Sequence, residues 1–267
     1  NQGSSPDFSV GEFWPDIPGA KYYDSYPNTD WHRQILVDWI NATGTTSTAF
    51  DFTTKWQLQL AMERGELWRL GSVPGLIGWW GEKAVTFLDN HDTGSTQNHW
   101  PFPGDKVLQG YAYILTHPGI PCIFWDHLYT WGHYNAIKAM LAARKAAGIL
   151  SDSTVSVQKS EANLYAALVG SNLAMKIGSG SWSPTGSDWT MAASGTDYAI
   201  WTKGGNPVPV TFSPAVAVAG QSLTVTYQGT LKDAATLNIH WGYDGFLVPQ
   251  VTAMTKQQNG SWTATVT

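Results

Sequence analysis

The chain has 267 residues, a formal net charge of −5 and a pI of about 5.7. This charge provides no attraction for nucleic acid or for an anionic membrane, so neither is an expected partner. No apolar run is long enough to cross a bilayer. The single cysteine, Cys122, excludes a disulfide framework, and its apolar neighbours predict a small buried side chain.

In the first half of the chain, short apolar runs alternate with segments of helical periodicity. Short apolar runs, which are typical of buried parallel strands, occur at Phe8–Phe13, Ala49–Phe52, Ala84–Leu88 and Ile120–Trp125. Segments with a helical period follow each run, at Trp31–Ile40, Thr54–Arg64, Val107–Leu115 and Tyr134–Ala147. Asp30 and either Thr53 or Thr54 are candidate helix caps. Four strand–helix units predict an α/β fold with a parallel sheet, although four units do not close an eight-stranded barrel.

The texture changes after Gly148. Strand-like segments at Val155–Val157, Leu164–Leu168, Leu173–Ile177 and Tyr198–Trp201 predict a small antiparallel β domain over residues 148–203, after a first domain of residues 1–147. Residues 204–209 have the composition of a linker. Alternation resumes in residues 210–267, where about four strands predict a partial β-sandwich, since a complete one has about seven.

Aromatic residues are unusually frequent. They make up 13% of the chain, as many as the charged residues, and 15 of them are tryptophans. Tryptophan commonly fills cores, but here several stand beside glycine or polar residues, as Trp79 and Trp80 do between Gly78 and Gly81. Flat apolar rings beside polar groups suit the apolar faces of sugar rings, so part of this set is predicted to bind carbohydrate.

Two strand ends carry acidic residues. The run that starts at Val10 ends in Glu12, and the run that starts at Val85 ends in His91 and Asp92. Parallel barrel strands deliver catalytic side chains to their carboxyl ends in this way. A lone acid at such a place is more often a solvated loop residue. Acids, a histidine and aromatics at successive strand ends together favour a site, and paired carboxyl groups are the apparatus of glycoside hydrolysis.

Several longer motifs resemble alpha-amylases of the plant type, over residues 8–203. They are Glu12–Trp14, Phe50–Lys55, Gly65–Arg69, Pro74–Trp80, Phe87–Gln97, Trp100–Pro103 and Gly110–Gly119. The resemblance implies the second half of a (β/α)8 TIM barrel, with strands five to eight, followed by the antiparallel C-terminal domain of that family. Residues 207–267, centred on Asn238–Gly245, resemble more weakly a starch-binding module of bacterial amylases.

The resemblance also implies catalytic roles. Glu12 is expected to be the general acid/base, the alternative being a salt-bridged structural glutamate. Asp92 is expected to stabilise the oxocarbenium-like transition state through hydrogen bonds to sugar hydroxyls. His91 is expected to bind the sugar at the cleavage subsite, the alternative being a structural hydrogen-bond partner. Asp89 and Asn90 are expected to satisfy backbone groups at the strand end.

The remaining candidates fall into three groups. Trp14, Gln97 and Trp100 are expected to line the substrate cleft. For a surface starch-binding site the candidates are Trp79 and Trp80 in an exposed Gly-flanked loop, and His240, Trp241 and Trp262 in the last module, with core packing as the alternative for each. Trp182 is either a sugar contact or a loop anchor. For Asp51, His117 and Asp126 a site role and a structural role are both open.

The function implied is endo-hydrolysis of alpha-1,4-glucosidic bonds in starch and maltooligosaccharides, with retention. The alternatives are a non-catalytic starch-binding fragment and a transglycosylase on the same barrel. In the family the nucleophilic aspartate and most ligands of a structural calcium belong to the first half of the barrel, which would precede this chain. Calcium is therefore an implied cofactor without assigned ligands here, secretion is the implied location, and the chain alone is expected to be inactive.

Overall fold

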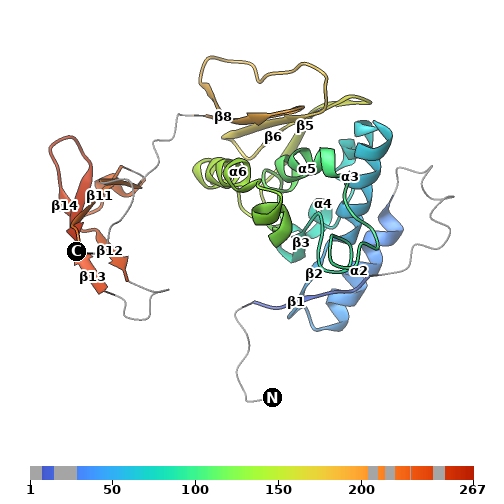
Figure 1. Ribbon diagram of the computed structural model, residues 1–267, viewed down its shortest axis with the longest axis horizontal. Coiled ribbons are helices and arrows are strands. Elements are labelled where there is room, and N and C mark those ends of the chain that lie inside the picture. The colour runs from blue at the N-terminus through green and yellow to red at the C-terminus, as the bar shows by residue number, and fades with distance from the viewer. Residues whose placement is uncertain (1–7, 15–28, 204–209, 214–219, 229, 243–249) are drawn as a thin grey trace. The chain divides into compact units, whose positions relative to one another are not determined.

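The computed structural model describes residues 8–14, 29–203, 210–213, 220–228, 230–242 and 250–267 (Figure 1). The chain divides into two compact units, residues 1–204 and 205–267, and each is described by itself. The linker predicted over residues 204–209 lies outside the described residues.

A four-stranded parallel sheet forms the base of the first unit. Its strands follow the chain order β1 (Val10–Gly11), β2 (Thr48–Phe50), β3 (Ala84–Thr86) and β4 (Ile120–Pro121), and all neighbours are parallel. This confirms the predicted parallel arrangement. Each strand is shorter than its apolar run, because apolarity signals burial rather than pairing: Phe87 and Leu88 are fully buried beyond the end of β3.

Helices connect these strands and cover the sheet. The longer ones are α2 (Asp30–Ala42), α3 (Phe52–Arg64), α5 (Val107–Ile114) and α6 (Tyr134–Ala147). Short helical segments not predicted from the sequence are η1 (Leu67–Ser72), α4 (Ile77–Trp80), η2 (Gly81–Lys83), η3 (Gly104–Lys106) and η4 (Asp126–Thr130). Among the described residues, none of the helices has both the length and the apolarity that a membrane crossing requires.

The predicted helix caps were wrong by a few residues. Asp30 and Thr54 lie inside α2 and α3, and the N-cap of α3 is Asp51, whose carboxylate accepts a hydrogen bond from the Thr54 backbone N–H at 2.9 Å. Asp51 also receives the backbone N–H of Ile77 at 3.0 Å. Its open site role is thus replaced by a structural one, in which a fully buried carboxyl group joins two helices.

A five-stranded antiparallel sheet packs on the helices. Its strands are β5 (Val155–Glu161), β6 (Leu164–Val169), β7 (Leu173–Ile177), β8 (Trp189–Gly195) and β9 (Tyr198–Lys203), in the order β5-β6-β7-β9-β8. Strand β8 was missed because it is an edge strand whose mostly exposed side chains show no regular apolar alternation. In Figure 1, α5 and α6 lie between this sheet and the parallel one, so both sheets share a single core.

His117 joins the end of α5 to the antiparallel sheet. Its ring is fully buried, with Nδ1 at 3.0 Å from the carbonyl oxygen of Tyr113 and Nε2 at 2.8 Å from the hydroxyl of Tyr165 on β6. A carbonyl only accepts, so Nδ1 donates and Nε2 accepts. Burial lowers the pKa of His117 from 6.5 to about 3, which keeps the ring neutral. The structural alternative therefore holds for this residue.

We expect His117 to make the first unit acid-sensitive. Its unfolded form takes up a proton below pH 6.5, whereas the folded form stays neutral to about pH 3. The free energy of unfolding should therefore fall as the pH drops through that window, by up to roughly 1.4 kcal/mol per unit of pKa shift. Urea unfolding of wild type and His117→Gln at several pH values measures this: the variant should show a shallower slope, and parallel slopes would contradict the assignment.

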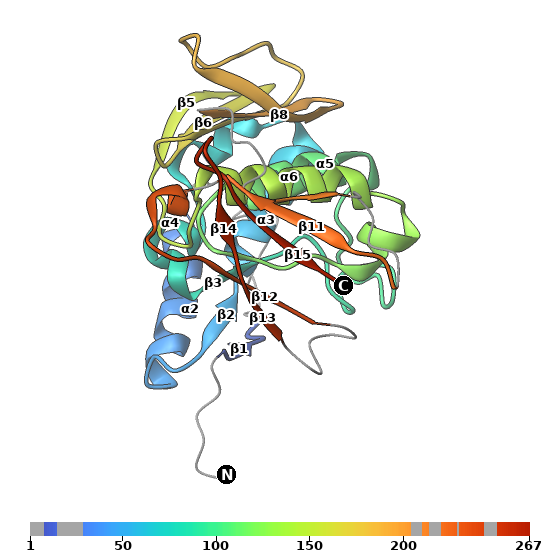
Figure 2. The ribbon, with the colours of Figure 1, turned by 90° about the vertical axis from the view of Figure 1, so that its left-hand side faces the viewer.

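The second unit consists of short antiparallel strands. They are β10 (Val210–Ser213), β11 (Leu223–Tyr227), β12 (Asn238–Trp241), β13 (Gln250–Ala253), β14 (Thr255–Lys256) and β15 (Trp262–Val266), with a helical turn η5 (Thr230–Asp233). They form one sheet in the order β10-β11-β15-β14 and a pair β12-β13; β11 and β15 run side by side in Figure 2. The described residues of this unit form six strands, against about four predicted; two of the six, β13 and β14, are only four and two residues long.

Candidate active site

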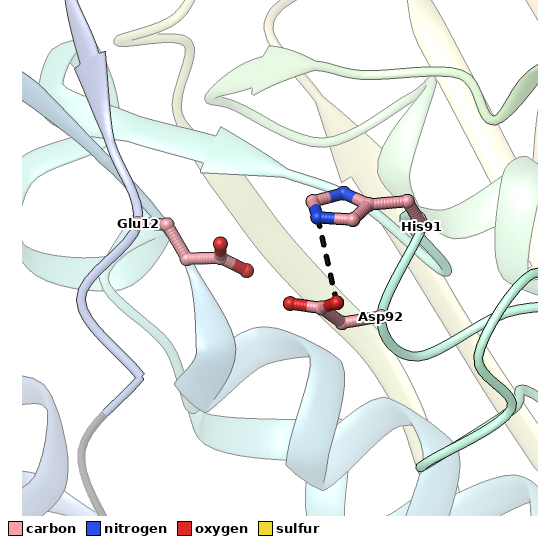
Figure 3. Close-up of side chains that lie close together, drawn as sticks. All are labelled: Glu12, His91 and Asp92. Atoms are coloured by element: carbon pink, nitrogen blue, oxygen red, sulfur yellow. Dashed lines mark ion pairs between the residues drawn. The ribbon is translucent and has the colours of Figure 1, made fainter.

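Glu12, His91 and Asp92 converge at the carboxyl end of the parallel sheet. Glu12 follows β1 directly, and His91 and Asp92 lie in the turn after β3. One ligand atom from each side chain lies within 4.8 Å of the others, and Figure 3 shows the three side chains together. His91 is 66% exposed and Asp92 26% exposed, so the cluster is open to a substrate. The structure thus brings together residues that are 80 positions apart in the sequence.

The carboxylate of Asp92 is held by its own loop. The Nε2 atom of His91 lies 3.4 Å from Asp92 Oδ1, and the side-chain amide of Gln97 donates to the same oxygen. Gln97 Oε1 in turn lies 3.0 Å from Nε2 of His99, which the sequence analysis did not single out. Gln97, predicted to bind substrate, therefore contacts Asp92, and its proximity to the site is the part of that prediction which the geometry supports.

A buried polar network supports the loop from below. Asp89 accepts hydrogen bonds from the backbone N–H of Phe102 at 3.1 Å, from Thr93 Oγ1 at 3.0 Å and from Lys55 Nζ at 3.2 Å. His127 Nε2 lies 3.3 Å from Asp89 Oδ2, the oxygen that also accepts from Phe102. The side chains of Asp89 and Lys55 are 1% and 0% exposed. The predicted backbone role of Asp89 is thus only part of what it does.

Burial affects the protonation of this network in two directions. Burial alone raises the pKa of Asp89, but the hydrogen bond with His127 and the charge of Lys55 outweigh it, so the pKa is lowered. Burial lowers the pKa of Lys55 to about 8, against the opposing charge of Asp89. Sequence reasoning missed Lys55, because a lysine within a helical segment reads as a surface residue until its surroundings are known. It also missed His127, which lies in the unpredicted segment η4.

Trp14 and Trp100 form a pair of neighbouring aromatic rings. Trp14 stacks on Phe52 with ring centroids 5.0 Å apart and lies 6.1 Å from the ring of Trp100, at an interplanar angle of 20°. Lys55 Nζ lies 4.8 Å from the Trp100 ring. Trp14 is 38% exposed, so part of its ring remains accessible, and its predicted place in the cleft stays a prediction.

The chain is similar in sequence to several known proteins. Residues 146–202 match the family described as the alpha-amylase C-terminal beta-sheet domain. An alpha-amylase type B isozyme of Hordeum vulgare is 48% identical over 154 residues, which are 55% of this chain and 99% of the barley protein. This chain belongs to the alpha-amylase family. Probable alpha-amylase 2 of Arabidopsis thaliana is 55% identical over 206 residues, which are 75% of the chain and 49% of that relative.

This chain therefore spans about half the length of its Arabidopsis relative. Among solved structures, CldA, described as the first cyclomaltodextrin glucanotransferase with a three-domain ABC distribution, superposes with a TM-score of 0.51 at 17% identity. The superposition covers 73% of this chain and 50% of CldA, and at this identity it supports the fold alone.

Asp126 contacts the loop that carries His91 and Asp92. Ser95, in the loop that carries His91 and Asp92, donates a hydrogen bond to its carboxylate, and Thr130 Oγ1 lies at 3.4 Å. Asp126 therefore ties the turn after β4 to the loop after β3.

Cys122, predicted to be buried, is half-buried beyond the end of β4, and burial raises the pKa of its thiol.

The surroundings of Trp79 and Trp80 differ from the exposed loop that the sequence predicted. The two residues lie in the short helix α4 rather than in an exposed loop, and they have different surroundings. Trp79 is 45% exposed and carries the Arg33 guanidinium 3.9 Å above its ring, whereas Trp80 is half-buried against the core. Both line a cavity of about 380 Å³ together with Asp152 and Thr154. Trp79 is therefore the more exposed of the pair, with one face of its ring covered by Arg33.

The other tryptophan candidates are mostly anchored. Trp262 is only 4% exposed, and the indole N–H of Trp241 donates to Thr252 Oγ1 at 2.9 Å. His240 is exposed on β12. Trp182 is half-buried with its ring 5.8 Å from that of Trp201, at 79°. Burial favours the packing alternative for Trp262 and the loop-anchor alternative for Trp182, and it leaves His240 as the accessible candidate.

The described residues do not fit the calcium that the family implies. Within them, Glu12, His91 and Asp92 are the one group of three ligating side chains close enough to share an ion. Calcium takes six to eight oxygen ligands, whereas this group has two carboxylates and an imidazole. The same side chains also face the proposed sugar site.

Proposed function

We propose that this chain supplies half of the active site of an enzyme that hydrolyses internal alpha-1,4-glucosidic bonds of starch with retention. The convergence of Glu12, His91 and Asp92 within 4.8 Å carries the proposal. We further propose that the four strand–helix units are half of a (β/α)8 barrel, that the second unit is a starch-binding module, and that the enzyme is secreted.

The proposed roles rest on the resemblance of these residues to the catalytic residues of the family. Glu12 donates a proton to the leaving glycosidic oxygen and, in the second step, takes one from water. Asp92 accepts hydrogen bonds from the hydroxyls of the sugar as positive charge develops on it, and His91 binds the same sugar. Retention needs a nucleophilic carboxylate about 5–5.5 Å from the acid/base. In the family that aspartate belongs to the half of the barrel that would precede this chain.

We expect Asp92→Asn to lower kcat far more than it changes KM. The asparagine keeps the shape and can still accept from Gln97, but it has no charge with which to stabilise a sugar that becomes positive in the transition state. Steady-state kinetics on a soluble maltooligosaccharide measure the split. The matched control is Asp188→Asn, because Asp188 is exposed and pairs with Lys203 in the antiparallel β domain. A normal kcat with a raised KM would reduce Asp92 to a binding residue.

We expect Trp79→Ala to weaken adsorption to starch granules while cleavage of short soluble maltooligosaccharides stays nearly unchanged. An exposed ring outside the cleft adds affinity for the polymer through effective concentration and does not touch the reacting bond. Trp80→Ala is the contrasting variant, because its ring packs on the core and its loss should lower stability instead. Equal losses by Trp79→Ala on granules and on short oligomers would place this ring in the cleft.

A further inference from the structure

The side chain of Asn90 bonds at both of its ends within the site. Its Oδ1 accepts the backbone N–H of Asp92 at 3.0 Å and that of Thr93 at 2.9 Å. Both partners are obligate donors, so the oxygen must face the loop and the amide nitrogen must face away from it. That nitrogen donates to Oε1 of Glu12 at 2.9 Å. The orientation of the amide therefore follows from its partners.

The backbone of Asn90 is anchored to the buried network. Its N–H donates to Thr93 Oγ1 at 3.0 Å, and that hydroxyl donates to Asp89 Oδ1 at 3.0 Å. Asp89 in turn is bonded to Lys55 in the core. Glu12 is exposed and follows a two-residue strand. Among the described residues, its side chain is hydrogen-bonded to the Asn90 amide. The side-chain amide of Asn90 thus connects the buried Asp89–Lys55 network to the exposed Glu12.

We propose that Asn90 is a positioning residue that orients the carboxyl group of Glu12 toward the scissile bond. This inference rests on the proposed function. Because the amide N–H bonds to Oε1, the acid form carries its proton on Oε2, the oxygen that then donates to the glycosidic oxygen. The same amide holds the Asp92 backbone, so it sets the relative placement of the two carboxyl groups. The backbone role expected from the sequence is only half of what Asn90 does.

Asn90→Asp separates the two halves of this role. The carboxylate can still accept from the Asp92 and Thr93 backbones, so the loop keeps its brace, but the donor to Glu12 is lost and a negative charge takes its place. In the starch-hydrolysing enzyme that carries this chain, we expect kcat to fall roughly 10- to 100-fold with little change in KM. The alkaline limb of the pH profile should also move to higher pH, because a neighbouring carboxylate favours a protonated acid.

Two comparisons decide the outcome. Asn135→Asp makes the same chemical change at an exposed position of α6 and should leave kcat and the pH profile as in wild type. In a Glu12→Gln background, Asn90→Asp should cause no further loss, because Asn90 acts through Glu12. An undiminished extra loss in the double variant, or a wild-type kcat and pH profile for Asn90→Asp, would overturn the inference. Full turnover by Glu12→Gln would instead overturn the proposed function on which it rests.

Discussion

Replacing Glu12 by glutamine should lower the turnover of starch by at least about 1000-fold, with little loss of starch binding. Glutamine has nearly the same shape as glutamate and can still accept the Asn90 amide through its side-chain oxygen. It cannot donate a proton to the leaving oxygen or take one from water, so both steps of a retaining mechanism lose their acid/base. Single-turnover kinetics and binding of a soluble maltooligosaccharide, measured on the same preparation, separate the chemical step from affinity.

A good control is Glu82→Gln, a change of the same kind in the short helix η2, away from the carboxyl end of the sheet. It should leave turnover unchanged. Turnover near wild type in Glu12→Gln would remove Glu12 from the mechanism. A large loss of binding with an unchanged single-turnover rate would show that Glu12 only holds the substrate.

The second large effect concerns stability. Asp89→Ala should lower the free energy of unfolding by about 3–5 kcal/mol, because it leaves the buried ammonium of Lys55 without its carboxylate. The backbone N–H of Phe102 and the hydroxyl of Thr93 lose their acceptor at the same time. Urea unfolding followed by a probe in the first unit measures the change near neutral pH, where Lys55 is mostly charged because its pKa is about 8.

The partner variant tests the cause. Adding Lys55→Met to Asp89→Ala should recover part of the lost stability, since the double variant no longer buries an unpaired cation. Asp105→Ala, which breaks an exposed contact with Lys106, should change stability little. Additive losses from Lys55→Met and Asp89→Ala would mean that the two charges stabilise the fold independently.

Local patterns in the sequence were sufficient for the outline of the first unit. The apolar runs and the helical periods placed four parallel strands and four long helices, with α6 correct at both ends, because these signals report burial and local hydrogen bonding. The edge strand β8 and the short helix α4 escaped prediction. An exposed edge has no apolar alternation, and a single helical turn is too short to establish a period.

By itself the sequence determined which strand ends carry Glu12, His91 and Asp92, since side chains at the carboxyl ends of parallel strands share one edge of the sheet. Only the tertiary structure decided how these groups are held. The bond from Asn90 to Glu12 joins residues 78 positions apart, and the Lys55–Asp89 pair joins residues 34 apart. Neither pairing has a sequence period, because which polar groups meet in the core depends on how the elements pack. The same holds for the more exposed ring of Trp79 and the packed ring of Trp80, which are neighbours in sequence but face different surroundings.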